Sequence, residues 1–103
     1  MKIPCRLRVG GQLLEVEFSQ NIEGSKLGKC CLSAGMIKIA QTFNGIKQSE
    51  SSKMNTFFHE VVHAICDTMG RADLSGDEVF VNTFASFMTE AYFSAEFEKT
   101  ENP

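Results

Sequence analysis

The two histidines of this 103-residue chain lie four positions apart in the segment His59-Glu60-Val61-Val62-His63, with a glutamate directly after the first. On a helix, this spacing brings both side chains to one face, about one turn apart. His59 and His63 could then offer two imidazole nitrogens to one zinc ion. Glu60 would lie beside the metal, where a carboxylate can take a proton from the attacking water. The segment therefore predicts a zinc site with Glu60 as general base.

A catalytic zinc needs a third protein ligand and leaves a fourth position for water. No histidine remains, so we expect a carboxylate. Asp67 shares a side of the helix with His63, but it would lie about 12 Å from His59 along the axis. That separation is too long for one ion. We therefore expect Asp67 to orient His63 as a hydrogen-bond acceptor.

Glu78 is the better candidate for the third ligand, because it begins a second helix that a short link should fold back against the first. Asp73 and Asp77 are possible but lie in or beside the turn. Asn82 shares the face of Glu78 and is a candidate for orienting that ligand or contacting substrate. The competing role of Glu78 is a capping box, in which its side chain would reach back to the backbone of Ser75.

The order of the predicted elements is strands first and helices second, which indicates an α+β fold with a single domain over residues 1–103. We expect a small antiparallel sheet of three or four strands followed by two packed helices. Gly10-Gly11 is a typical two-residue hairpin turn. The strands are predicted at 3–9, 12–18, 27–32 and 36–40, and the helices from about 51 or 52 to 69 and from about 75 to 97.

Apolar residues at helical spacing predict which faces of the two helices are buried. On the first helix these are Met54, Phe58, Val61, Val62, Ile65 and Met69. On the second they are Phe80, Phe84, Phe87, Met88, Ala91 and Ala95. The predicted fourth strand places one charge among apolar residues, as an edge strand often does. It consists of Met36, Ile37, Lys38, Ile39 and Ala40.

Composition excludes several classes of function. The formal net charge of −3 argues against nucleic acid as a partner, because phosphate binding needs a basic surface. No apolar run approaches the length of a membrane span, and the N-terminus lacks the long apolar segment of a signal peptide. We therefore expect a cytoplasmic protein whose four cysteines are reduced. Cys66, one turn beyond His63, could instead close a structural zinc site.

Two segments resemble a known family. The stretch from Asn55 to Ile65 looks like the active-site helix of zincin metallopeptidases, most of all the small phage and prophage proteins related to the ImmA/IrrE group. The stretch from Glu78 to Ala85 resembles that group's second motif, a glutamate followed four residues later by an asparagine, then an aromatic and a small residue. Gly28, a turn at Ala34-Gly35 and the segment Ile37-Lys38-Ile39 fit its N-terminal part.

The resemblance implies that His59, His63 and Glu78 bind zinc, that Glu60 is the general base, and that an extended peptide pairs with the strand of residues 36–40. The expected function is zinc-dependent hydrolysis of a peptide or protein substrate. The alternative is a binding or regulatory module of phage or prophage origin that keeps the zincin scaffold without turnover.

Aromatic residues late in the second helix raise two further points. Tyr92 is the one tyrosine, but it lies too far from Glu78 along a straight helix to contact the reacting carbonyl. If Phe93 and Phe97 face outward, a homodimer through the second helix is expected.

Overall fold

An N-terminal sheet and C-terminal helices make up the computed structural model, which describes residues 3–24 and 26–98. The α+β class is confirmed. The sheet strands are β1 (Arg6–Val9), β2 (Gln12–Ser19), β3 (Gly28–Cys31) and β4 (Met36–Ala40), with a 3-10 turn, η1 (Leu32–Ala34), before β4. A small hairpin, β5 (Thr42–Phe43) and β6 (Ile46–Lys47), precedes the helices α1 (Glu50–Thr68), α2 (Ala72–Ser75) and α3 (Glu78–Ser94).

The four strands form one sheet in the order β1-β2-β4-β3. The predicted hairpin between β1 and β2 is confirmed, and both turn glycines, Gly10 and Gly11, have positive φ, as a two-residue turn of this kind requires. β4 pairs antiparallel with β3 but parallel with β2. The sheet is therefore mixed, whereas an antiparallel sheet was expected.

The prediction that Met36 to Ala40 form an edge strand is wrong, because β4 lies between β2 and β3. Ile37, Ile39 and Ala40 are fully buried. The charge of Lys38 had indicated an edge strand. Lys38 instead lies on the open face of the sheet, where it forms an ion pair with Glu17 of β2 at 3.8 Å. A charge on the open face of a central strand gives the same sequence pattern as a charge on an edge. The edge strand next to β4 is β3.

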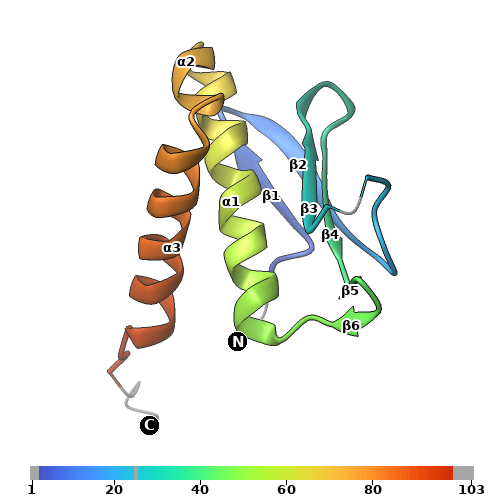
Figure 1. Ribbon diagram of the computed structural model, residues 1–103. Coiled ribbons are helices and arrows are strands. Elements are labelled where there is room, and N and C mark those ends of the chain that lie inside the picture. The colour runs from blue at the N-terminus through green and yellow to red at the C-terminus, as the bar shows by residue number, and fades with distance from the viewer. Residues whose placement is uncertain (1–2, 25, 99–103) are drawn as a thin grey trace, which may run out of the picture.

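Helix α1 lies between the sheet and α3, as Figure 1 shows. Its sheet side buries Met54, Phe57, Val61 and Ala64, and its α3 side buries Val62 and Cys66. A helix in the middle layer is buried on two faces, so its apolar surface is wider than the single predicted stripe. Two members of that stripe, Ile65 and Met69, are exposed at the end of α1.

Helix α3 packs on α1 through small side chains, Val81 and Ala85, which allow the two helices to approach closely. The predicted buried stripe of α3 is therefore largely wrong. Phe84 is 47% exposed and Phe87 is 65% exposed on the side away from α1. The structure leaves these rings without cover among the described residues.

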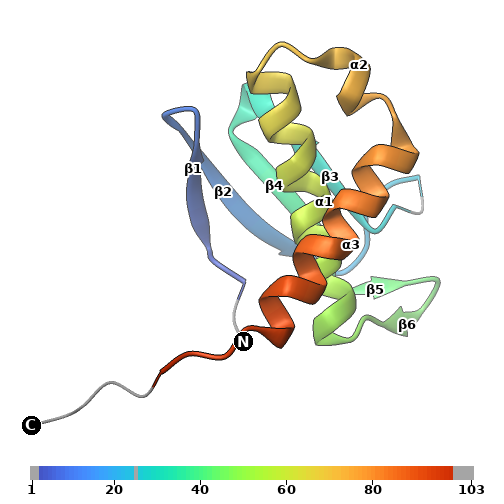
Figure 2. The same cartoon turned by 90° about the vertical axis from the view of Figure 1, so that its left-hand side faces the viewer.

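Local hydrogen bonds fix where the long helices begin. The side chain of Ser49 accepts a hydrogen bond from the backbone N–H of Ser52 at 3.1 Å, which starts α1 at Glu50. Figure 2 shows the β5–β6 hairpin beside this first turn. Asp77 caps α3 by accepting from the N–H of Phe80 at 3.1 Å. The predicted capping box is therefore wrong, because Asp77 caps α3 in place of Ser75. Within the described ranges, no helix is long and apolar enough to cross a membrane.

Candidate metal centre

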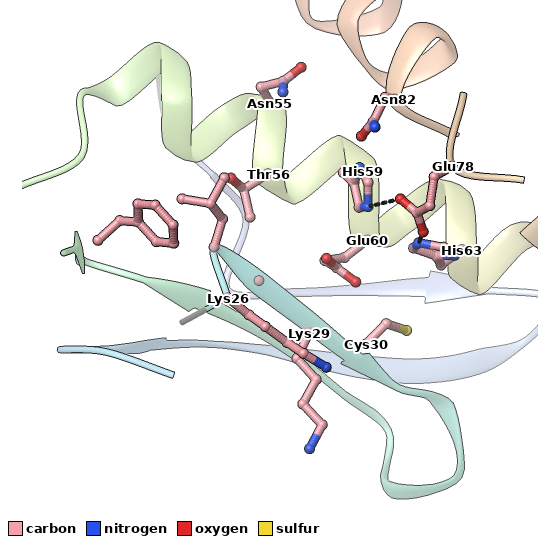
Figure 3. A pocket seen from close by; sticks show the side chains of 13 residues that line it. Lys26, Lys29, Cys30, Asn55, Thr56, His59, Glu60, His63, Glu78 and Asn82 are labelled. Atoms are coloured by element: carbon pink, nitrogen blue, oxygen red, sulfur yellow. Dashed lines mark ion pairs between the residues drawn. The ribbon is translucent and has the colours of Figure 1, made fainter. Parts of the chain in front are cut away.

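Three side chains predicted as ligands converge at the junction of α1 and α3 (Figure 3). His59 Nε2 lies 3.7 Å from Glu78 Oε2, and His63 Nε2 lies 3.5 Å from Glu78 Oε1. One potential ligand atom from each residue lies within 4.8 Å of the other two. These three residues could hold a metal ion. The two histidines come from successive turns of α1, and Glu78 is the first residue of α3.

The link between the helices brings Glu78 back to the histidines. Gly70, with φ of +74°, lies just after α1, and α2 follows at once. Arg71 forms a two-pronged ion pair with Asp73, in which the Arg71 Nη2 and Asp73 Oδ2 atoms are 2.9 Å apart. Asp73 is thus engaged with Arg71, and Asp77 caps α3. Of the three carboxylates considered around the turn, the structure brings Glu78 to the histidines.

Ser75 is a site residue that the sequence reasoning missed. Its Oγ lies 3.0 Å from His63 Nδ1, within hydrogen-bond distance, and it leaves Nε2 free to face Glu78. The prediction that Asp67 orients His63 is wrong, because Ser75 occupies that place and Asp67 is exposed on α1. In the sequence, Ser75 stands out only as a hydroxyl-bearing residue in the short link between the helices, and it was predicted to cap the second helix.

Glu60 is buried at the base of the site, with 6% of its surface exposed. Burial, and secondarily the negative charge of Glu78, raise its pKa to about 7, while Lys26 acts in the opposite direction. Gly28 of β3 makes room for this side chain. A Cβ at Gly28 would lie 3.1 Å from Glu60 Oε2 and 2.5 Å from Thr56 Cγ2. The close approach of β3 to α1 therefore requires glycine at this position.

The surroundings of His59 favour its neutral form. Burial lowers its pKa, and the neighbouring His63, whose ring centroid is 4.9 Å away, lowers it further. Glu78 and the side chain of Asn82 act in the opposite direction. A neutral imidazole is the form that binds a metal ion.

A cleft of about 610 Å³ opens in front of these residues. Its wall on the sheet side is the edge strand β3 and the residues before it, and its other walls are α1, α3 and Phe43 of β5. The lining residues are Lys26, Leu27, Gly28, Lys29, Cys30, Phe43, Asn55, Thr56, His59, Glu60, His63, Glu78 and Asn82. Asn82 was a predicted site residue, and the structure brings it to the cleft.

Within residues 3–24 and 26–98, the side of β3 that faces away from β4 presents backbone groups without a strand partner. The N–H of Ala40 donates to the carbonyl of Leu27, so Leu27 faces β4. Backbone direction alternates along an antiparallel strand, which turns the N–H and C=O groups of Gly28 and Cys30 away from β4. The edge beside the site is thus β3, in place of the predicted residues 36–40.

Two alternatives from the sequence can be placed in the structure. Cys66 is buried in the α1–α3 interface with Val62, Val81 and Ala85, and it does not join the group formed by the two histidines and Glu78. The cysteine that lines the cleft is Cys30, whose pKa burial raises to about 11, so its thiol stays protonated. Tyr92 packs edge-on against Phe58, with ring centroids 5.9 Å apart, and is not a lining residue.

Comparison with protein-family models, with curated proteins and with solved structures finds no match to this chain. The resemblance of its two helical motifs to zincins therefore stays a prediction. Its function has to be inferred from the geometry of the cleft.

Proposed function

We propose that this protein is a zinc-dependent peptidase in which His59, His63 and Glu78 bind the metal and Glu60 is the general base. The observation that carries the proposal is the convergence of two imidazole nitrogens and a carboxylate beside a separate, buried carboxyl group. Metal ligands and general base thus come from four side chains with distinct positions, as hydrolysis at a catalytic zinc requires.

The three donors lie close enough to bind one zinc ion after a small movement. Tetrahedral zinc with ligand bonds of about 2.05 Å places neighbouring ligand atoms about 3.3 Å apart. The nitrogen–oxygen distances of 3.5 and 3.7 Å end on different oxygens of Glu78, and one donor atom from each residue lies within 4.8 Å of the other two, so the donors have to move closer together to bind one ion. With Nε2 of His63 as ligand, Nδ1 carries the proton and donates it to Ser75 Oγ, which fixes the ring. Glu78 is mostly exposed, so its carboxylate can adjust.

Bound zinc would supply a Lewis acid that acidifies water and polarises a peptide carbonyl. Glu60 accepts the proton of the attacking water at a carboxylate oxygen and passes it to the leaving amine. In the metal-free protein the pKa of Glu60 is about 7, and bound zinc would favour the ionised form that accepts the proton. Glu60 lines the cleft but is not part of the group formed by the two histidines and Glu78, which keeps the two roles apart.

The substrate proposed here is an extended segment of peptide or protein. The outward backbone groups of Gly28 and Cys30 can pair with such a segment as an added strand. Asn82, on the opposite wall, offers an amide for a substrate carbonyl. This assigns to β3 the pairing that the family resemblance implied for residues 36–40.

A binding module without turnover is the second candidate, and the open edge of β3 favours it, because strand pairing captures a peptide whether or not hydrolysis follows. In either case we propose a phage or prophage origin, by the family resemblance, and a cytoplasmic location. The four free cysteines support that location, because reduced thiols persist in a reducing compartment.

Metal analysis and peptide cleavage test the proposal in sequence. Purified protein dialysed against zinc should retain one equivalent, and Glu78→Ala should lose it, while Glu90→Ala, an exposed carboxylate elsewhere on α3, should not. Glu60→Gln should retain zinc and lose cleavage of an unstructured protein or peptide library. Wild-type protein that binds no zinc refutes the peptidase, and zinc binding without cleavage in wild type favours the binding module.

A further inference from the structure

Helix α3 carries two apolar seams, of which one packs inside the protein and the other is mostly exposed. The inner seam, Val81, Ala85 and Met88, packs toward α1. The outer seam consists of Phe80, Phe84, Phe87 and Ala91, of which Phe80 also packs partly against the inner cluster. One residue is a rotation of about 100°, so the two seams face different directions. The spacing of four, three and four residues in the outer seam is that of helices packing on one another.

The surface of the outer seam alternates between projecting rings and hollows, as helix-packing surfaces do. Phe84 and Phe87 stand between two apolar hollows. One hollow, of about 390 Å³, is lined by Asp77, Val79, Phe80, Thr83, Phe84 and Phe87. The other, of about 270 Å³, is lined by Phe84, Phe87, Met88 and Ala91. The seam carries no charge, so like charges do not oppose the pairing of two copies along it.

We propose that this seam binds a second copy of the chain, with the two α3 helices antiparallel. A twofold axis between Phe84 and Phe87 sets Phe84 against the partner's Phe87, and Phe80 against the partner's Ala91. Each large ring at the ends then meets a small side chain, which is the complementarity a symmetric interface needs. The antiparallel arrangement also sets the positive end of each helix dipole beside the negative end of the other.

The area available suits a reversible dimer. At their exposed fractions, the rings of Phe84 and Phe87 together present about 220 Å² to water, taking about 200 Å² for a full side chain. With exposed Val79 and Thr83 and the flanking backbone, each copy can bury about 500 Å², or about 1,000 Å² in total. That total is at the low end of specific interfaces, so we expect a dissociation constant in the micromolar range.

The dimer would leave the metal centre open. Glu78 and Asn82 lie on a side of α3 about 170° from the outer seam. Phe93 and Phe97 are both exposed, as the predicted dimer required, but Phe93 points about 150° from the seam and Phe97 follows the helix. The proposed dimer therefore forms through Phe84 and Phe87 in place of Phe93 and Phe97, and it does not depend on zinc.

Sedimentation equilibrium from about 5 to 500 µM protein tests the proposal, with circular dichroism to confirm folding. Wild type should form a dimer over this range, with and without EDTA. Phe87→Glu and Phe84→Glu should each weaken it at least about tenfold, because a buried carboxylate would face the partner's ring. Ile46→Glu, which changes an exposed apolar residue of β6 in the same way, should have no effect. A monomer throughout, or a dimer that survives both seam variants, overturns the proposal.

Discussion

Replacing Glu60 with glutamine should change the free energy of unfolding of the metal-free protein by an amount that depends on pH. The variant should be more stable relative to wild type at pH 8 than at pH 4. In the fold the pKa of Glu60 is about 7, against an ordinary value of 4.5. Between these values the folded protein holds a proton that the unfolded chain has lost. The free energy of unfolding of wild type therefore falls as pH rises from about 4.5 to about 7. Glutamine has no proton to lose, so it avoids this cost.

The size of the effect follows from the same two pKa values. The gap between them corresponds to about 3 kcal/mol once the pH exceeds 7. The side chain is almost fully buried, so solvent screens this cost little. The difference in unfolding free energy between Glu60→Gln and wild type should therefore change by about 3 kcal/mol in favour of the variant between pH 4 and pH 8.

Urea denaturation in EDTA at pH 4, 5, 6, 7 and 8 measures this difference. His59 contributes with the opposite sign, because its lowered pKa makes stability rise with pH up to its unfolded value of 6.5. Both proteins contain His59, so subtracting one curve from the other removes its contribution. Glu90→Gln, at an exposed site, should follow wild type at every pH. A difference between Glu60→Gln and wild type that does not change with pH would refute the burial argument.

Three further substitutions test the supports of the site. Ser75→Ala should weaken zinc binding by about 10- to 100-fold, measured by competition with a chelator, because His63 loses the partner of its Nδ1. Asp77→Ala should lower the free energy of unfolding by about 1 kcal/mol, measured in urea, through loss of the α3 cap. Gly28→Ala should lower the free energy of unfolding by about 1–3 kcal/mol, measured in urea, because the added methyl group would clash with Thr56 Cγ2. Adding Thr56→Ser, which removes that methyl group, should recover part of the loss; no recovery would contradict the contact.

The parts of the site that depend on local pattern could be predicted from the sequence. The spacing of His59 and His63 fixes their common face on any helix, and a short link between two helices brings Glu78 back toward them. Ser75 could not be found in this way. Its contact with His63 depends on the path of the link, in which the single turn of α2 and the cap at Asp77 set the direction of each side chain.

The order of the strands and the inward face of α3 depend on contacts between distant residues. An alternating strand with one lysine fits an edge or a one-sided central strand equally well, so Lys38 could not separate the two. On α3 both seams are apolar. Val81 and Ala85 form the buried face because their small side chains let α3 approach Val62 and Cys66 closely. Which face is buried therefore depends on the shape of α1. Hydrophobicity alone favours the larger side chains, such as Phe84 and Phe87, as the buried face of α3, whereas close packing against α1 requires the smaller ones.

The metal-free site is costly in a way that a cation would relieve. Glu60 is buried by the approach of β3 at Gly28, and the charge of Glu78 adds to the rise in its pKa. Two neighbouring carboxyl groups disfavour the ionisation of each other, and the positive charge of Lys26 offsets only part of the rise in the pKa of Glu60. Zinc held by Glu78 and the histidines would favour the ionised form of Glu60 that a general base needs. The same contacts that lower stability without metal thus prepare the base for use with it, which is why the glycine and both glutamates belong to one proposed mechanism.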